Sequence, residues 1–97
     1  EKRISARLRV AYDTPSALVA QVPVLAEESV RAGEGARFVS CLLAEIGAYA
    51  LEFELVYFIA NEVGQIPRTT DAVNRGIVAR FGAAGIAFAY PTRRQLG

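Results

Sequence analysis

The stretch ARFVSCLLAEIGAYALEFELVYFIAN, residues 36–61, determines the fold, because two long apolar segments flank a short linker that begins with Gly47. This spacing predicts a β-hairpin with its turn at Gly47. If Ile46 faces Leu51, one side of the hairpin carries Phe38, Ser40, Leu42, Ala44, Ile46, Leu51, Phe53, Leu55, Tyr57 and Ile59. The other side then carries Val39, Cys41, Leu43, Glu45, Glu52, Glu54, Val56 and Phe58.

A strand and a helix are expected before the hairpin. Residues 4–12 alternate apolar and polar side chains, which is the period of a strand with one face in the core. Residues 13–33 begin with an Asp or Thr cap and a proline, and then repeat apolar residues at helical spacing. Pro23 lacks the N–H that would bond the carbonyl of Val19, so we expect the helix to kink or break there.

A second helix and a last strand are expected after the hairpin. The helix is predicted over about residues 70–84, with Phe81 on its buried stripe. Gly85 follows in the position that favours a left-handed stop. The last strand carries its apolar side chains at Ile86, Phe88 and Tyr90.

The predicted order is therefore strand, helix, strand, strand, helix, strand. An α+β ferredoxin-like sandwich is the simplest closure, with one sheet and both helices on one of its faces. In that arrangement the first and third strands are central neighbours, and the second and fourth strands are edges. A chain of 97 residues suffices for one modest core, so residues 1–97 are expected to be a single domain.

Composition argues against catalysis and against nucleic acid. The chain has no His, the commonest general base and metal ligand, so we expect no catalytic residue, no cofactor and no metal site. Eleven Lys and Arg against ten Asp and Glu give a net charge of +1, which creates no overall field to attract nucleic acid. Cys41 is the only cysteine, and without an imidazole to activate it a buried or interface thiol is expected.

Charged side chains gather on one face of the predicted sheet. Glu45, Glu52 and Glu54 cluster across the hairpin, and Arg7 and Arg9 project from the same face of the adjacent strand. The carboxylates could form an acid pair or a cation site. Cross-strand pairs of opposite charge are also a routine way to stabilise a solvated sheet surface, and we expect this structural role.

Two apolar surfaces are predicted to lack a partner within the chain. The first is the sheet face without helices, where Val39, Cys41, Leu43, Val56 and Phe58 would form a patch. The second is the C-terminal edge strand. We expect an oligomer interface that contains Val39, Leu43, Val56, Phe58, Phe88, Tyr90 and Pro91. Scattered surface apolar residues, which most proteins have, are the alternative.

Three segments together resemble a known family. VAYDT at residues 10–14, LAEIGAYALEFEL at residues 43–55 and FGAAGIAFAYP at residues 81–91 are similar, in order and spacing, to the carboxyl-terminal cytoplasmic domain of the small-conductance mechanosensitive ion channel family. In that family a strand ends in Val-x-Tyr-Asp, a hairpin contains x-Glu-Leu-Gly, and the domain closes with Ala-Gly-Ile-x-Phe-Pro-Tyr-Pro. This chain departs from the pattern at Ala89, where the family often has proline.

The resemblance implies a non-catalytic cytoplasmic cage domain of a tension-gated channel that releases solutes on osmotic downshock. Upstream transmembrane segments would hold it at the cytoplasmic side of the cell membrane, whereas the fragment alone would be soluble. The intact channel would be a homo-heptamer, and residues 92–97 would start an intersubunit strand. A free-standing ferredoxin-like regulatory domain that binds a small ligand between subunits is the alternative function. An enzyme of the same fold is disfavoured by the absence of His.

Overall fold

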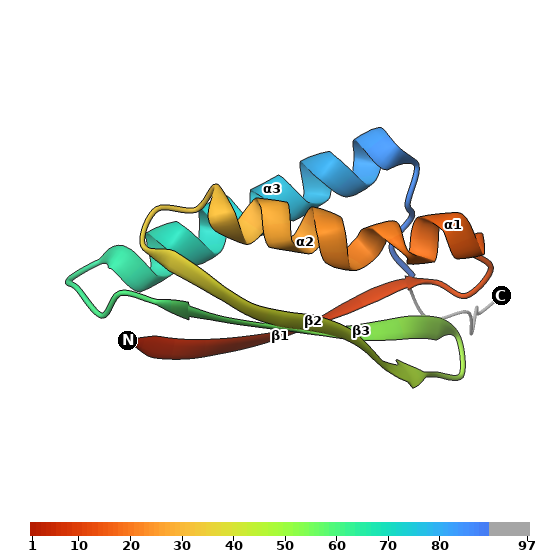
Figure 1. The fold of residues 1–97 in the computed structure, drawn as a ribbon, viewed down its shortest axis with the longest axis horizontal. Helices are drawn as coiled ribbons and strands as arrows, with labels where there is room; N and C mark the ends of the chain where they lie inside the picture. The colour runs from red at the N-terminus through yellow and green to blue at the C-terminus, as the bar shows by residue number, and fades with distance from the viewer. Residues whose placement is uncertain (90–97) are drawn as a thin grey trace, which may run out of the picture.

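Residues 1–89, the part of the chain that the computed structural model describes, form a three-stranded antiparallel sheet with helices on one face (Figure 1). In chain order the elements are β1 (Lys2–Ala11), α1 (Ser16–Val19), α2 (Gln21–Arg31), β2 (Ala36–Ile46), β3 (Ala50–Ile59) and α3 (Gln65–Ala84). The strand order is β1-β3-β2, so β3 is central and antiparallel to both neighbours. The predicted α+β class and the predicted pairing of the first strand with the third are confirmed.

The predicted last strand is represented within residues 1–89 by one antiparallel bridge, between Val10 of β1 and Phe88. Two backbone hydrogen bonds of 3.0 Å flank it, from Ala11 N–H to the Ala87 carbonyl and from Ala89 N–H to the Arg9 carbonyl. The described sheet therefore has three strands instead of the predicted four, because this pairing covers too few residues to extend the sheet. The arrangement is compatible with a ferredoxin-like fold. The remaining predicted residues of this strand and the tail, Tyr90, Pro91 and residues 92–97, lie outside the described residues.

The first predicted helix is broken into α1 and α2 at Ala20. Pro23 lies in the first turn of α2 and has no N–H to bond the carbonyl of Val19, the last residue of α1. The break predicted from Pro23 is confirmed. It lies before the proline because the missing hydrogen bond belongs to a carbonyl four residues earlier in the chain.

α3 begins at Gln65, five residues earlier than predicted. Gly64 precedes it with a φ of 73°, and Pro67 lies in the first turn, where a missing N–H costs no helical hydrogen bond. At the other end of α3, Gly85 has a φ of 82°. This left-handed stop confirms the role predicted for Gly85.

The β2–β3 turn contains Gly47, as predicted. The Gly47 N–H donates a hydrogen bond of 2.8 Å to the carbonyl of Ala50 and so closes the turn. A Cβ at Gly47 would lie 2.9 Å from Oε2 of Glu52 and 3.1 Å from the Ala50 carbonyl oxygen. Close approach of these neighbours therefore favours glycine here.

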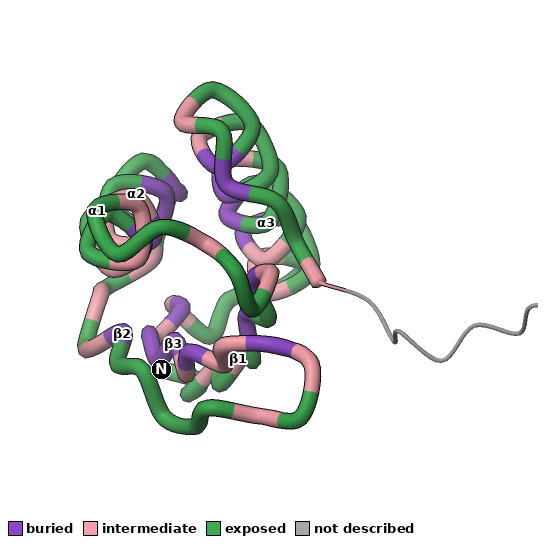
Figure 2. Tube along the Cα trace, turned by 90° about the vertical axis from the view of Figure 1, so that its right-hand side faces the viewer, coloured by how far each residue is buried: buried purple, intermediate pink, exposed green. Residues whose placement is uncertain are grey.

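The core lies between the sheet and the two longer helices, α2 and α3 (Figure 2). Its members include Phe53, Leu55, Tyr57 and Ile59 of β3, Val22, Ala26 and Val30 of α2, and Val73, Ile77 and Phe81 of α3. Phe81 is fully buried, which confirms its predicted place in the core. Burial raises the pKa of Tyr57, and a side-chain hydrogen bond with Thr70 opposes that rise.

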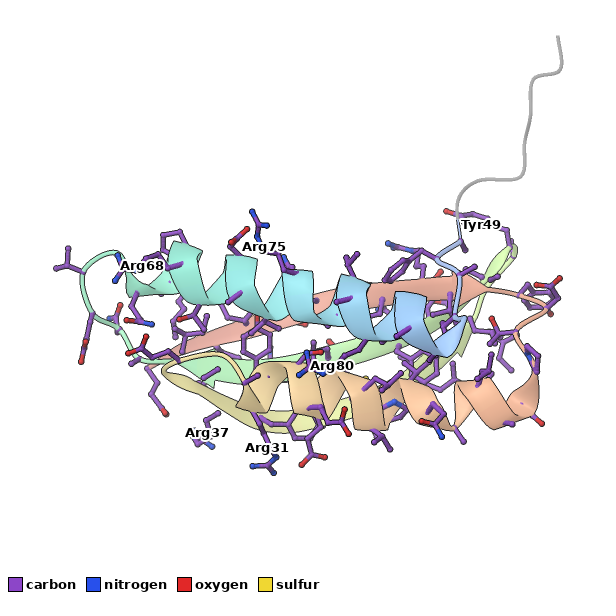
Figure 3. The ribbon with its side chains drawn as sticks, turned by 90° about the horizontal axis from the view of Figure 1, so that it is seen from above. Arg31, Arg37, Tyr49, Arg68, Arg75 and Arg80 are labelled. Carbon is purple, nitrogen blue, oxygen red and sulfur yellow. The ribbon has the colours of Figure 1, made fainter. Side chains whose placement is uncertain are left out.

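α2 and α3 lie side by side over the sheet (Figure 2). A Cβ at Gly33, just after α2, would lie 2.9 Å from Cγ2 of Val73, so the glycine permits close contact with α3. Arg80 of α3 reaches toward α2 (Figure 3), and its Nε is 3.7 Å from Oε1 of Glu28. This packing leaves the opposite face of the sheet without helices.

Candidate assembly surface

Two β-bulges in β2 decide which of its side chains meet solvent. The register with β3 shifts at Val39 and again at Ala44, and each of these residues has no partner in β3. Successive side chains of a strand point to opposite faces, so each extra residue moves the side chains that follow it to the other face. The predicted pair of Ile46 with Leu51 is confirmed. The prediction that side chains alternate between the two faces without interruption along β2 is wrong.

Between the two bulges the predicted faces are exchanged. Cys41 pairs with Leu55 and is 5% exposed, so its side chain belongs to the core under the helices. Leu43 pairs with Phe53, which lies on the same face. The prediction that Cys41 and Leu43 lie on the sheet face without helices is wrong, because the bulge at Val39 reverses the alternation.

The sequence predicted either a buried or an interface thiol at Cys41, and the structure shows that the thiol is buried. Burial raises its pKa from 9.0 to about 11. The thiolate is the reactive form of cysteine, so the folded chain keeps this thiol protonated and unreactive near neutral pH.

On the sheet face without helices, charged side chains lie beside the apolar residues of β3. Val56 is only 6% exposed there. The guanidinium carbon of Arg37 lies 4.7 Å from the centroid of the Phe58 ring, and Nη2 of Arg37 is 2.9 Å from Oε1 of Glu1. The hydrogen bond with Arg37 lowers the pKa of Glu1. The exposed apolar patch predicted around Val56 and Phe58 is therefore wrong, because Val56 is buried and Arg37 covers the ring of Phe58.

The predicted charged group is assembled on this open face. Glu52 lies between two cations: its carboxylate is 3.8 Å from Nη1 of Arg7 and 3.6 Å from Nε of Arg9. Glu54 accepts a hydrogen bond of 3.0 Å from Oγ of Ser5. Within residues 1–89, no group of three or more His, Cys, Asp or Glu is placed to hold a metal ion. The arrangement is that of cross-strand ion pairs.

The outer segment of β2, residues 39–46, exposes apolar side chains on both faces at the edge of the sheet. The exposed fractions are 46% for Val39, 66% for Leu42, 44% for Leu43 and 66% for Ile46. Val39 and Leu43 were among the predicted interface residues. Leu42 and Ile46 were missed. The bulge at Val39 moves Leu42 to the open face, whereas Ile46 keeps its predicted pair with Leu51 and is exposed at the end of the hairpin. Neither bulge residue is a glycine, so the sequence carries no mark of the bulges.

A second apolar surface lies beyond the end of β1, between the β2–β3 turn and the segment that follows α3. It is a hollow of about 370 Å³, lined by residues 11–13, Tyr49 and residues 87–89, and we call it the edge pocket. Tyr49 extends from the β2–β3 turn toward the point where the described chain ends (Figure 3). All lining residues belong to the three segments on which the family resemblance rests.

Phe88 joins the edge pocket to the core. Its ring stacks on Phe81 with centroids 5.2 Å apart and planes at 12°, and the residue remains 39% exposed. The prediction that Phe88 has no partner within the chain is wrong, because after the stop at Gly85 the chain returns to β1 and pairs with Val10. The other predicted interface residues of this segment, Tyr90 and Pro91, lie outside the described residues.

Comparisons with known proteins identify no relative: no protein-family model matches the chain, and neither does any curated protein. Within residues 1–89, none of the helices is both long enough and apolar enough to cross a membrane. The two exposed apolar surfaces and the resemblance of the three segments therefore remain as the indications of function.

Proposed function

We propose that this chain is a non-catalytic assembly domain that associates with copies of itself. In line with the resemblance, its place is the lower part of the cytoplasmic cage of a tension-gated small-conductance mechanosensitive channel, which releases solutes on osmotic downshock. The observation that carries the proposal is the outer segment of β2, with four large apolar side chains exposed on one strand.

An edge strand presents unpaired backbone donors and acceptors, and native proteins usually protect it with charges, prolines or a covering element. Residues 39–46 contain one charged residue, Glu45, and no proline. The bulges at Val39 and Ala44 interrupt the backbone ladder, which disfavours open-ended strand pairing. A side-chain contact with a second copy buries the apolar residues without extending the sheet.

The fold supports the channel assignment in one further respect. The segments at residues 10–14, 43–55 and 81–91 are far apart in sequence, yet they meet around the edge pocket. A resemblance whose parts converge on one surface is more informative than three isolated matches. The finer fold proposal is accordingly ferredoxin-like, with the segment that pairs with β1 at Phe88 in the place of the fourth strand.

Sedimentation velocity over a wide concentration range tests self-association. We expect the parent chain to form larger species with rising concentration, and Leu42→Glu to shift this transition to higher concentration. The matched control is Val78→Glu, because Val78 on α3 is 61% exposed, close to the 66% of Leu42. A parent chain that stays monomeric at the highest concentration contradicts the assembly function.

The channel assignment has its own test in the coding sequence upstream of Glu1. Apolar segments of about 20 residues, with a segment rich in Gly and Ala, are expected there. A different upstream sequence would contradict the channel assignment. Self-association would then be judged from the sedimentation result alone.

A regulatory domain that binds a small ligand is the second candidate, and the edge pocket is the observation that favours it. A ligand that binds only the folded chain raises its melting temperature in proportion to the logarithm of ligand concentration above Kd. A thermal-shift screen of metabolites against the parent and Tyr49→Ser separates this candidate from self-association, because only specific pocket binding is lost in the variant.

A further inference from the structure

We infer that the edge pocket binds a small organic cation whose nitrogen carries methyl or other alkyl groups, as in a quaternary ammonium compound. The inference rests on the second candidate function, ligand binding at the edge pocket, and specifies the chemical class of the ligand. It concerns a surface other than the outer segment of β2, so it depends neither on self-association nor on the channel assignment.

Three aromatic side chains line the edge pocket, and each comes from a different segment of the chain. Tyr12 follows β1, Tyr49 lies in the β2–β3 turn (Figure 3) and Phe88 follows α3. The face of an aromatic ring is negative and attracts a cation that lies within about 6 Å of the ring centroid. Apart from Asp13, the other lining residues are alanines, whose methyl groups suit the alkyl groups of such a ligand. Aromatic rings gathered around one hollow are a recurring means of recognising quaternary ammonium groups.

Contacts within the chain hold these rings in place. The turn that carries the first ring is closed by a hydrogen bond of 3.0 Å from the Thr14 N–H to the Ala11 carbonyl. The Ala11 N–H donates another, also of 3.0 Å, to the Ala87 carbonyl and ties this turn to the segment after α3. The ring of Phe88 stacks on Phe81 with centroids 5.2 Å apart, while the residue stays 39% exposed. A site whose walls are already fixed loses less conformational entropy when a ligand binds.

Asp13 supplies a negative charge to the edge pocket. It is exposed, and it is the only charged residue among the described residues that line the hollow. Within residues 1–89 it takes part in no ion pair. A carboxylate beside aromatic rings complements a cationic ligand and repels an anionic one.

Other classes of ligand suit the edge pocket less well. A hard metal ion needs several oxygen ligands, and within residues 1–89 no group of three or more His, Cys, Asp or Glu is placed to hold one. A neutral apolar ligand would contact the rings and methyl groups but would leave the Asp13 carboxylate without a partner. An alkylated ammonium ion satisfies both features, because it carries its charge beneath an apolar surface. The hollow of about 370 Å³ lies within the range of roughly 300 to 1,000 Å³ that small-molecule sites occupy.

Ligand-detected NMR titration tests the inference with choline and with neohexyl alcohol, in which carbon replaces the nitrogen of choline. We expect choline to bind the parent chain saturably and the neutral alcohol to bind about fivefold or more weakly, because the rings and Asp13 recognise the charge. Tyr12→Leu removes a ring on a side chain that is 56% exposed, and Asp13→Asn removes the charge at constant size. Each should weaken choline binding about fivefold or more and change binding of the alcohol by less than about twofold. Glu62→Gln, in the exposed turn at the other end of β3, is the matched control and should bind choline as the parent does.

The outcomes are separable once circular dichroism shows that each variant is folded. Equal affinity of the parent for choline and the alcohol would reveal a purely apolar site, which overturns the cationic ligand and keeps ligand binding at the edge pocket. Choline binding that is unchanged in Tyr12→Leu, Asp13→Asn and Tyr49→Ser lies elsewhere and also overturns the inference. If choline binds only after Arg93 and Arg94 are both changed to Gln, the chain's own cations compete for the pocket, and a small-molecule ligand is wrong.

A parent chain that does not bind choline overturns the inference, and the thermal-shift screen then decides the second candidate function separately. A metabolite whose stabilising effect is lost in Tyr49→Ser would keep ligand binding at the edge pocket with a different class of ligand. A screen without such a metabolite would remove the second candidate function as well.

Discussion

The two faces of the sheet keep their central strand out of water by different means. On the helix-covered face, Phe53 and Tyr57 of β3 are each 1% exposed beneath α2 and α3. On the open face, Val56 of the same strand is 6% exposed with no helix over it, between Ser5 of β1 and Ser40 of β2. The open face is only partly covered, because Glu52, Glu54 and Phe58 of β3 remain partly exposed there. Residues 42–46 of the edge strand β2 are all exposed and lack both kinds of cover.

Removing a large side chain of α3 that packs against the helix-covered face should have the largest effect on stability. Phe81 is fully buried and stacks on Phe88, so Phe81→Ala leaves a cavity and removes the stacking partner. We expect a loss of about 3 to 5 kcal/mol in the free energy of unfolding, which is much of the total stability of a small domain. Urea denaturation measures it.

The control for this prediction is Phe81→Leu, which keeps most of the apolar volume and should cost clearly less than the alanine variant. A Phe81→Ala chain with the parent's urea midpoint would show that packing by α3 contributes little to the covered face.

The next largest expected effect is on the reaction rate of the Cys41 thiol. A pKa of about 11 for Cys41, against 9.0 for an unshifted thiol, lowers the thiolate fraction near pH 8 by roughly 100-fold. The disulfide reagent DTNB should therefore react at least that much more slowly with the folded parent than with Val39→Cys in a Cys41→Ser background, since Val39 is 46% exposed. Equal rates for the two thiols would contradict the core position of Cys41.

The same shift gives the sign of a pH effect. The folded chain binds the thiol proton more tightly than the unfolded chain does, because its pKa is raised. This contribution to stability is complete below pH 9.0 and is lost as the pH rises toward about 11. Cys41→Ser should remove that part of the alkaline destabilisation.

A glycine pair measures how firmly the segment after α3 is held against the covered face. Gly85 has a φ of 82°, and a Cβ added there would meet no atom within 4 Å, so Gly85→Ala should cost roughly 1 to 2 kcal/mol from the left-handed backbone alone. Gly82 has equally open space but lies inside α3, so Gly82→Ala should stabilise by about 0.5 to 1 kcal/mol. Thermal melts that move in the same direction for both variants would contradict the stop at Gly85.

The sequence predicts the covered face better than the open one for a physical reason. Helical periodicity places Phe81 correctly, and the backbone preferences of glycine and proline place the stop at Gly85 and the break at Pro23, because each depends on local geometry within one element. The faces of β2 depend on bulges at Val39 and Ala44, and those arise from pairing with β3, not from any residue with a special backbone preference. One undetected extra residue sent Cys41 inward and Leu42 outward. The contact of Arg37 with the Phe58 ring could not be predicted either, because Arg37 is distant in sequence from Phe58 and from its ion-pair partner Glu1.

The smallest effect is expected on the open face itself. Glu52 pairs with Arg7 and Arg9 at 3.8 and 3.6 Å, and the two arginine side chains are 38% and 48% exposed, so water and salt screen the attraction. Pairs of this kind contribute about 0 to 1 kcal/mol each, and Glu52→Gln removes the charge while keeping the size of the side chain. We therefore expect the variant to fold and to lose at most about 1 kcal/mol, with the loss shrinking in concentrated salt. Glu62→Gln in the exposed β3–α3 turn is the matched control and should be neutral. If Glu52→Gln instead cost as much as Phe81→Ala, the open face would rival the helix-covered core in stabilising the sheet, and the contrast between the two faces would be wrong.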